Sequence, residues 1–135
     1  MASSSLLSAE ICCCCARSGW WEEDRGVTQR FFNEALGLPG EAPQFCEPWV
    51  VERILRQHAS SQSLIAVFPL QDLFGLEHSL RVSDPQAERI NIPAVKRHYW
   101  RYRMQLPIED LQTKHADWTR RVNWLLTQSG RLTAV

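Results

Sequence analysis

Four consecutive cysteines, Cys12–Cys15, are the first residues of this 135-residue chain whose types suggest chemistry, and a fifth, Cys46, stands alone. Zinc sites normally use spaced pairs of Cys or His, because adjacent side chains diverge and cannot all face one ion. A disulfide framework also spaces its cysteines apart, and palmitoylation would need a nearby membrane signal that the sequence does not show. We therefore expect no metal site and no cofactor, and we interpret residues 1–18 as a disordered leader unrelated to the remainder.

A polar pair, Gln71 and Asp72, follows the apolar run Leu64–Phe68 and Pro69. The run has no polar alternation, which is typical of a strand buried on both faces of a parallel sheet. Pro69 would end that strand because proline has no N–H to donate to the ladder. Ligand-binding groups of α/β folds lie just beyond the carboxyl ends of strands. The pair is therefore a candidate binding site, and the alternative is that it caps the strand end and anchors the next loop.

A basic and aromatic stretch at 96–103 is the third chemical feature. It interleaves positive charges with large rings: Lys96, Arg97, Tyr99, Trp100, Arg101, Tyr102 and Arg103. Such a stretch can bind RNA through phosphate contacts and stacking, or it can seal a domain surface as an extended segment. The 15 basic and 15 acidic residues cancel, so no wider basic surface supports a nucleic-acid partner. The longest apolar run, Leu64–Leu70, is far below the roughly 20 residues that a membrane helix needs, so we expect no membrane partner.

Three helices would position these features. Phe31, Phe32, Ala35 and Leu36 share one helical face, with the pair Trp20 and Trp21 at the helix start and Gly37 and Pro39 at its end. Pro48 suits the first position of a second helix, whose buried stripe is Val50, Val51, Ile54 and Leu55. A last amphipathic helix carries Ile108, Leu111, His115, Trp118, Val122 and Leu125, and "SGR" at 129–131 ends it. Residues 77–95 show neither period and are predicted to form a long ordered loop.

These elements predict an α-rich α/β fold with one convincing strand. A lone parallel strand would leave buried backbone groups unpaired, which is costly. We therefore interpret residues 19–135 as a fragment of a larger barrel or sheet. On the same ground we expect the helix stripe at Val50–Leu55 and the strand Leu64–Phe68 to lack covering neighbours, and the isolated chain to be poorly soluble or molten.

Four stretches, in this order and spacing, resemble the C-terminal part of 4-alpha-glucanotransferases: "GWWEED", "FPLQDLFGL", "ERINIPAVKRHYWRYR" and "LPIEDL…SGR". These enzymes are the amylomaltases or disproportionating enzymes of glycoside hydrolase family 77, and the plant-type cytosolic form is the most similar. The resemblance covers about residues 19–131. It implies a (β/α)8 TIM barrel that moves segments of α-1,4-glucan to an acceptor sugar with retention, using a carboxylate nucleophile and a carboxylic acid roughly 5 Å apart.

The resemblance also implies which residues contact sugar. Asn91, in "RINIP", matches a family asparagine near the bound glucan, and Gln71 and Asp72 match the family's "PLQD" at the end of the last barrel strand. The family's nucleophilic Asp and acid/base Glu lie well upstream of the tryptophan pair. Its third carboxylate belongs to a His-Asp motif that would align with Cys12–Cys15, where no His or Asp stands. We therefore expect no catalytic residue in this chain, and a foreign sequence joined at about residue 18.

Three classes of function remain open. The chain could be part of a glucanotransferase that is inactive alone, a non-catalytic piece that binds α-1,4-glucan or maltooligosaccharide, or an unrelated basic-aromatic RNA-binding module. The opening "MASSSLLS" is Ser-rich like a transit peptide, but Arg17 is the only positive charge before residue 19 and Glu10 is acidic. We expect a cytoplasmic protein, with the plastid as the alternative.

Overall fold

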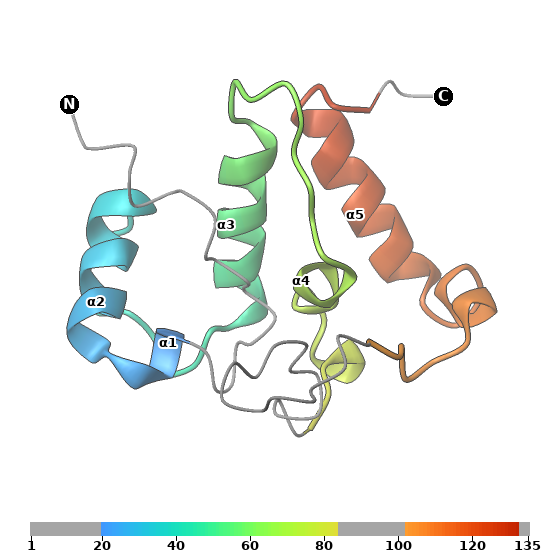
Figure 1. The fold of residues 1–135 in the computed structure, drawn as a ribbon, viewed down its shortest axis with the longest axis horizontal. Coiled ribbons are helices and arrows are strands. Elements are labelled where there is room, and N and C mark those ends of the chain that lie inside the picture. Colours follow the sequence, from blue (N-terminus) through green and yellow to red (C-terminus); the bar gives the residue numbers. More distant parts are fainter. Residues whose placement is uncertain (1–19, 84–101, 133–135) are drawn as a thin grey trace, which may run out of the picture.

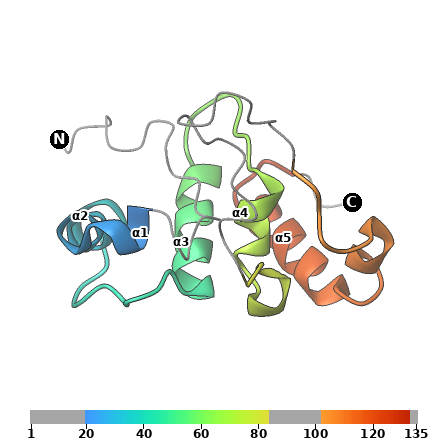
Figure 2. The ribbon, with the colours of Figure 1, turned by 60° about the horizontal axis from the view of Figure 1, so that its bottom comes forward.

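The computed structural model describes residues 20–83 and 102–132. These residues form short and medium helices; from left to right in Figures 1 and 2 lie the pair α1 and α2, then α3, α4 and α5. The elements are α1 (Trp20–Glu23), α2 (Arg25–Arg30), the π-helical turn η3 (Phe31–Ala35), α3 (Pro48–Ala59), α4 (Leu70–Phe74), the 3-10 turns η4 (His78–Leu80) and η6 (Ile108–Leu111), and α5 (Ala116–Gln128). The described part of the chain contains helices and no strand, so the α-rich character is confirmed there and the α/β character is not seen.

The predicted first helix is broken into three pieces. Asp24 has extended backbone, and its carboxylate accepts hydrogen bonds from the N–H groups of Gly26 and Val27, so it ends α1 and caps the start of α2. A buried Thr28 hydroxyl donates to the Trp21 carbonyl at 2.7 Å and ties the two helices together. The predicted end is confirmed, because Gly37 has a φ of 65°, a left-handed conformation that favours glycine.

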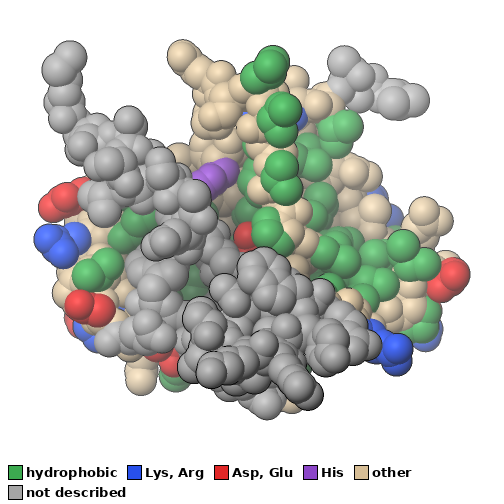
Figure 3. Space-filling view, in the orientation of Figure 1, with side chains coloured by type: hydrophobic (Ala, Val, Ile, Leu, Met, Phe, Trp, Pro, Cys, Tyr) green, Lys and Arg blue, Asp and Glu red, His purple; other side chains and the backbone are tan. Residues whose placement is uncertain are grey.

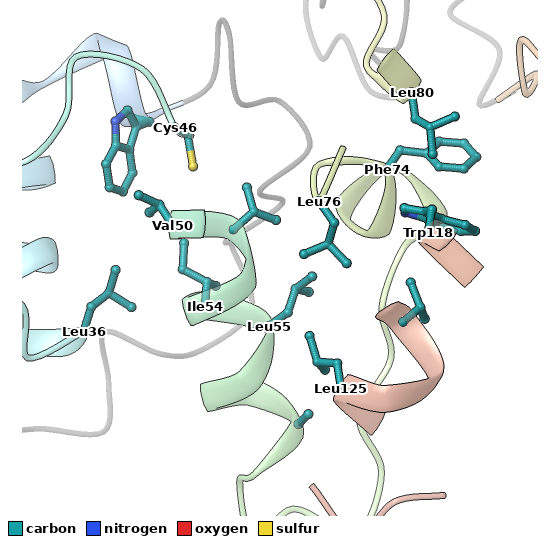
Figure 4. Close-up of a cluster of buried hydrophobic side chains, with 14 of the residues drawn as sticks. Leu36, Cys46, Val50, Ile54, Leu55, Phe74, Leu76, Leu80, Trp118 and Leu125 are labelled. Carbon is teal, nitrogen blue, oxygen red and sulfur yellow. The ribbon is translucent and has the colours of Figure 1, made fainter. Parts of the chain in front are cut away.

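Helix α3 forms as predicted, with Pro48 at its first position. Its stripe of Val50, Val51, Ile54 and Leu55 is 0–3% exposed. The expectation that this stripe would lack neighbours is wrong, because α3 lies in the middle of the core (Figure 4). The buried core residues are Trp21, Phe32, Leu36, Ala42, Cys46, Val50, Val51, Ile54, Leu55, Ala59, Phe74, Leu76, Leu80, Trp118, Val122 and Leu125.

The predicted strand Leu64–Phe68 is wrong within this structure. The residues form an irregular, extended segment between α3 and α4, and Leu64, Ile65 and Val67 are 95%, 74% and 81% exposed. The apolar run is therefore neither paired nor buried on both faces. The physical reason is that a strand needs a neighbour, and the described residues hold no other strand to pair with it.

The predicted last helix is two elements. Residues Ile108–Leu111 form η6, a turn follows, and α5 begins after His115, so His115 precedes the helix instead of lying inside it. Trp118, Val122 and Leu125 are buried as predicted, and Gly130 with a φ of 73° ends the helix. The predicted loop 77–95 contains the 3-10 turn η4, whose Leu80 is buried; its residues from 84 onward lie outside the described part.

Polar contacts hold α3 against α5. Glu52 of α3 accepts hydrogen bonds from Arg121 of α5 and from Arg56, and Arg121 also donates to the Leu76 carbonyl at 3.0 Å. The Arg56 guanidinium lies 4.4 Å from the ring centroid of Trp124. Burial alone would raise the pKa of Glu52, but the hydrogen bonds from Arg121 and Arg56 lower it below its ordinary 4.5. The carboxylate is therefore charged and structural at neutral pH.

Candidate functional site

The polar pair predicted from the sequence lies in the first turn of α4. Pro69 has a φ of −57° and a ψ of 143°, so it enters the helix from an extended segment, and its carbonyl accepts from the Asp72 N–H at 3.0 Å. Gln71 and Asp72 are 6% and 4% exposed, which is rare for a carboxylate and an amide. The pair was predicted to lie just past the end of a strand, but in this structure it belongs to a helix that follows an irregular segment.

The close approach of α4 to α3 fixes the position of this pair. Gly75 ends α4, and a Cβ added there would lie 3.0 Å from the Asp72 carbonyl oxygen and 3.1 Å from Val51 Cγ1. The absence of a side chain at Gly75 therefore lets the two helices pack closely. On the other side, Trp118 of α5 donates to the Leu73 carbonyl at 2.8 Å and packs against Phe74 with ring centroids 5.3 Å apart.

His58, near the end of α3, is the third member of the site. Its Nε2 atom is buried and has no hydrogen-bond partner. Burial lowers the pKa of His58 below its ordinary 6.5, and the nearby negative charge of Asp72 offsets this only in part. The neutral imidazole of His58 therefore lies near the buried carboxylate of Asp72. Its Nε2 atom can donate or accept a hydrogen bond, depending on the tautomer.

His58 was not among the site residues predicted from the sequence. A signal existed, because His58 follows Ile54 by four residues and Leu55 by three, which places it beside the buried stripe of α3. A histidine at such a position is ordinarily a core residue, so the sequence alone could not distinguish it. Asn91, the remaining predicted substrate-binding residue, lies outside the described residues, and so do Cys12–Cys15 and most of the basic-aromatic stretch.

Three other acidic residues of the described part make local contacts within helices and turns. Asp110 pairs with Lys114 at 2.9 Å, Asp117 pairs with Arg120, and Asp24 caps α2. Retaining glycosyl transfer instead needs a nucleophilic carboxylate and an acid about 5 Å apart across the sugar. The described contacts thus give these acids a role in holding helices and turns.

The described residues were predicted to hold no metal site and no membrane segment. Within residues 20–83 and 102–132, no group of three or more His, Cys, Asp or Glu side chains is placed to hold a metal ion. No helix in the same ranges is long and apolar enough to cross a membrane. Cys46 is buried and forms no disulfide.

Comparison with known proteins identifies the class. The model of a family described as 4-alpha-glucanotransferase matches residues 16–109. Because that match spans most of the chain, the chain belongs to the 4-alpha-glucanotransferase family, as the sequence motifs predicted. It is similar to the 4-alpha-glucanotransferase DPE2 of Oryza sativa subsp. japonica, with 36% identity over 110 residues. Those residues are 82% of this chain and 12% of the rice protein. No solved structure matches this chain.

Proposed function

We propose that this chain is the glucan-contacting C-terminal segment of a 4-alpha-glucanotransferase and is inactive alone. The observation that carries the proposal is the family match over residues 16–109, which includes Gln71, Asp72 and Asn91. In the complete protein, the reaction is the transfer of α-1,4-glucan segments to an acceptor sugar. The catalytic carboxylates would come from sequence that matches the larger remainder of such an enzyme, because this chain spans 12% of its rice relative.

In that assembly, Leu64–Phe68 would be a barrel strand of the (β/α)8 fold and α4 would follow it. The exposed side chains of Leu64, Ile65 and Val67 support this role, because they are apolar yet uncovered in the isolated chain. Neighbouring barrel strands would satisfy the segment's backbone groups and cover these side chains. Asp72 and Gln71 would then lie just beyond the strand's carboxyl end, where barrel enzymes bind their ligands.

The first test measures turnover. Purified chain incubated with maltotriose should release no measurable glucose, because loss of the nucleophile and the acid removes several orders of magnitude in rate. Clear glucose release that copurifies with the chain would contradict the proposed inactivity and would require catalytic carboxylates within these residues.

The second test measures glucan contact. Migration through a native gel that contains amylopectin should be retarded, and Asn91→Ala should reduce the retardation because it removes an amide suited to sugar hydroxyls. Asn123→Ala, on the exposed face of α5, is the matched control and should not change it. Retardation that is equal in both variants, or absent in the parent chain, would contradict a glucan-binding role.

For the location of the protein in the cell, we propose the cytoplasm, with the plastid as the alternative. A fluorescent fusion would examine this.

A further inference from the structure

The exposed apolar side chains of the described residues are of two kinds, aliphatic and aromatic. The most exposed aliphatic ones lie on the segment between α3 and α4, and Figure 3 shows them as a column along the face where this segment runs in Figure 1. In the proposed barrel, neighbouring strands would cover that column. The exposed rings are Phe45, Trp49 and Trp124, at 47%, 49% and 46%. Tryptophan is on average highly buried, so two half-exposed indoles call for an explanation.

The two indoles have different surroundings. Trp124 of α5 lies beside the second half of α3, where the Arg56 guanidinium sits over its ring, 4.4 Å from the centroid. Trp49, in the first turn of α3, packs against the buried ring of Phe32, with centroids 6.0 Å apart and ring planes at 80°. A perpendicular ring orients the indole and can cover at most one of its two faces. Trp49 therefore offers an oriented ring with an open flat face.

Two polar side chains accompany this ring. Glu47 comes two residues before Trp49, and its Oε2 atom lies 3.3 Å from Nε2 of His78 in η4. Both side chains reach solvent, with exposures of 37% for Glu47 and 67% for His78. The carboxylate accepts hydrogen bonds, and the imidazole can donate or accept them, so together they can bind hydroxyl groups. A flat apolar ring with a few polar groups beside it is the composition that suits a sugar, which has a C–H face and hydroxyl edges.

Arg81 places this group of residues next to the candidate site. It follows η4 and donates hydrogen bonds to the Cys46 carbonyl at 2.8 Å and to the Gly75 carbonyl at 3.1 Å. Arg81 thus joins the residues before α3 to the end of α4, the helix that carries Gln71 and Asp72. In Figures 1 and 2, α3 begins at the end of the molecule towards which the segment before α4 runs. In barrel enzymes, ligands bind at the end towards which the strands run.

We propose that the Trp49 indole is a stacking surface for a glucose ring of an α-1,4-glucan, with Glu47 and His78 binding hydroxyl groups beside it. This inference rests on the proposed function, because that function supplies the glucan. It adds a contact outside the three residues predicted from the family motifs. Trp49 carries no group that could transfer a proton or attack a sugar, so its role is to bind the glucan and not to take part in the chemical step.

A titration of the ¹⁵N-labelled full chain with maltoheptaose tests the contact, followed through the indole Nε1–H signals of its six tryptophans. The signal that is missing in Trp49→Phe identifies Trp49, and the signal that is missing in Trp124→Phe identifies Trp124. We expect the Trp49 signal to shift progressively and to saturate. The Trp124 signal should stay in place.

Calorimetric titration of variants measures how much the ring contributes. Trp49→Leu should raise the maltoheptaose dissociation constant about two- to tenfold, the range expected for one aromatic contact. Trp49→Tyr keeps a flat ring and should restore most of the affinity. Trp124→Leu is the matched control, because Trp124 is as exposed as Trp49, and it should leave the constant unchanged. If Trp49→Leu lost its helical circular dichroism, the indole shifts of the unsubstituted chain would decide.

These experiments separate the inference from the proposed function. A Trp49 signal that stays in place while Asn91→Ala weakens binding would overturn the inference and leave the proposed glucan contact intact. A Trp49 shift with unchanged affinity in Asn91→Ala would support the inference and contradict the role of Asn91. Equal losses of affinity in Trp49→Leu and Trp124→Leu would overturn the inference alone, whereas a parent chain that does not bind maltoheptaose would contradict both.

Discussion

Helix α3 and the segment that follows it contain the same kinds of residues and have opposite surroundings. Val50, Val51 and Leu55 of α3 are at most 3% exposed, whereas Leu64 and Val67 are at least 81% exposed. A helix satisfies its backbone hydrogen bonds internally and needs only side-chain partners to be buried. An extended segment needs a second strand to satisfy its backbone. Residues of equal hydrophobicity are therefore buried in the core on α3 and left exposed, without a partner strand, in the segment that follows.

The largest expected effect is a direct test of this contrast. Leu55→Ala should lower the free energy of unfolding by about 2–5 kcal/mol, because it leaves a cavity in the core. Leu64→Ala removes the same atoms from a side chain that is 95% exposed, so it should change stability by less than about 0.5 kcal/mol. Urea unfolding followed by circular dichroism measures both. Similar losses for the two variants would mean that Leu64 is covered in solution.

A smaller effect is expected where the two regions meet. Arg131, just after α5, donates to the carbonyls of Ala59, Ser61 and Ser63 at 2.5–3.0 Å and so ties the end of α3 and the start of the exposed segment to α5. Arg131→Met should cost about 1–2 kcal/mol, since exposed hydrogen bonds contribute modestly. It should also speed amide exchange at the end of α3.

Arg30→Met provides the control for this change. Arg30 is an exposed arginine of α2 and makes none of these carbonyl contacts, so its replacement should alter neither stability nor exchange by a measurable amount. An equal loss in both variants would show that the effect comes from charge and not from the contacts of Arg131.

The smallest effect concerns pH and His58, which lies at the segment end of α3. Its pKa is lowered in the folded chain, chiefly by burial, so the unfolded chain binds more protons between that lowered pKa and the ordinary 6.5. Stability should therefore fall as the pH drops below about 6.5 and level off below the folded pKa. Thermal melts between pH 8 and pH 5, values chosen to bracket the ordinary histidine pKa, measure this.

His58→Gln should flatten that part of the pH profile, because it removes the group whose pKa is lowered by burial. A profile that stays unchanged in His58→Gln would show that another group carries the pH dependence.

The sequence predicted the helices better than their surroundings. Pro48 and the spacing of Val50, Val51, Ile54 and Leu55 defined α3, because a helix depends on its own residues for start, stripe and backbone pairing. The break at Asp24 was missed because the helix was predicted from the spacing of its apolar residues, and a single capping carboxylate does not disturb that spacing. The strand prediction was wrong for a different reason: Leu64–Phe68 has the composition of a strand, but its state depends on a partner that the described residues do not supply.

The candidate site divides in the same way. A binding role for Gln71 and Asp72 stays a prediction, made from their place after an apolar run and from the family motif. His58 could not be predicted, because its orphaned Nε2 and its proximity to Asp72 arise only when α4 packs on α3. The sequence around a histidine beside a helical stripe does not show whether its side chain only packs in the core or also lies near a buried carboxylate.

The contacts of Arg131 and Glu52 also bear on the order in which the chain folds. Arg131 bonds Ala59 from 72 residues away, and Arg121 bonds Glu52 from 69 residues away, whereas Thr28 reaches Trp21 across seven. A long loop must close before a contact between distant residues can form, and this closure costs chain entropy. Folding steps that depend on such distant contacts are therefore slow. The α1–α2 unit can therefore assemble early, and the docking of α5 on α3 is the late step. Until that step, the Arg131 contacts that tie Ala59, Ser61 and Ser63 to the end of α5 are absent.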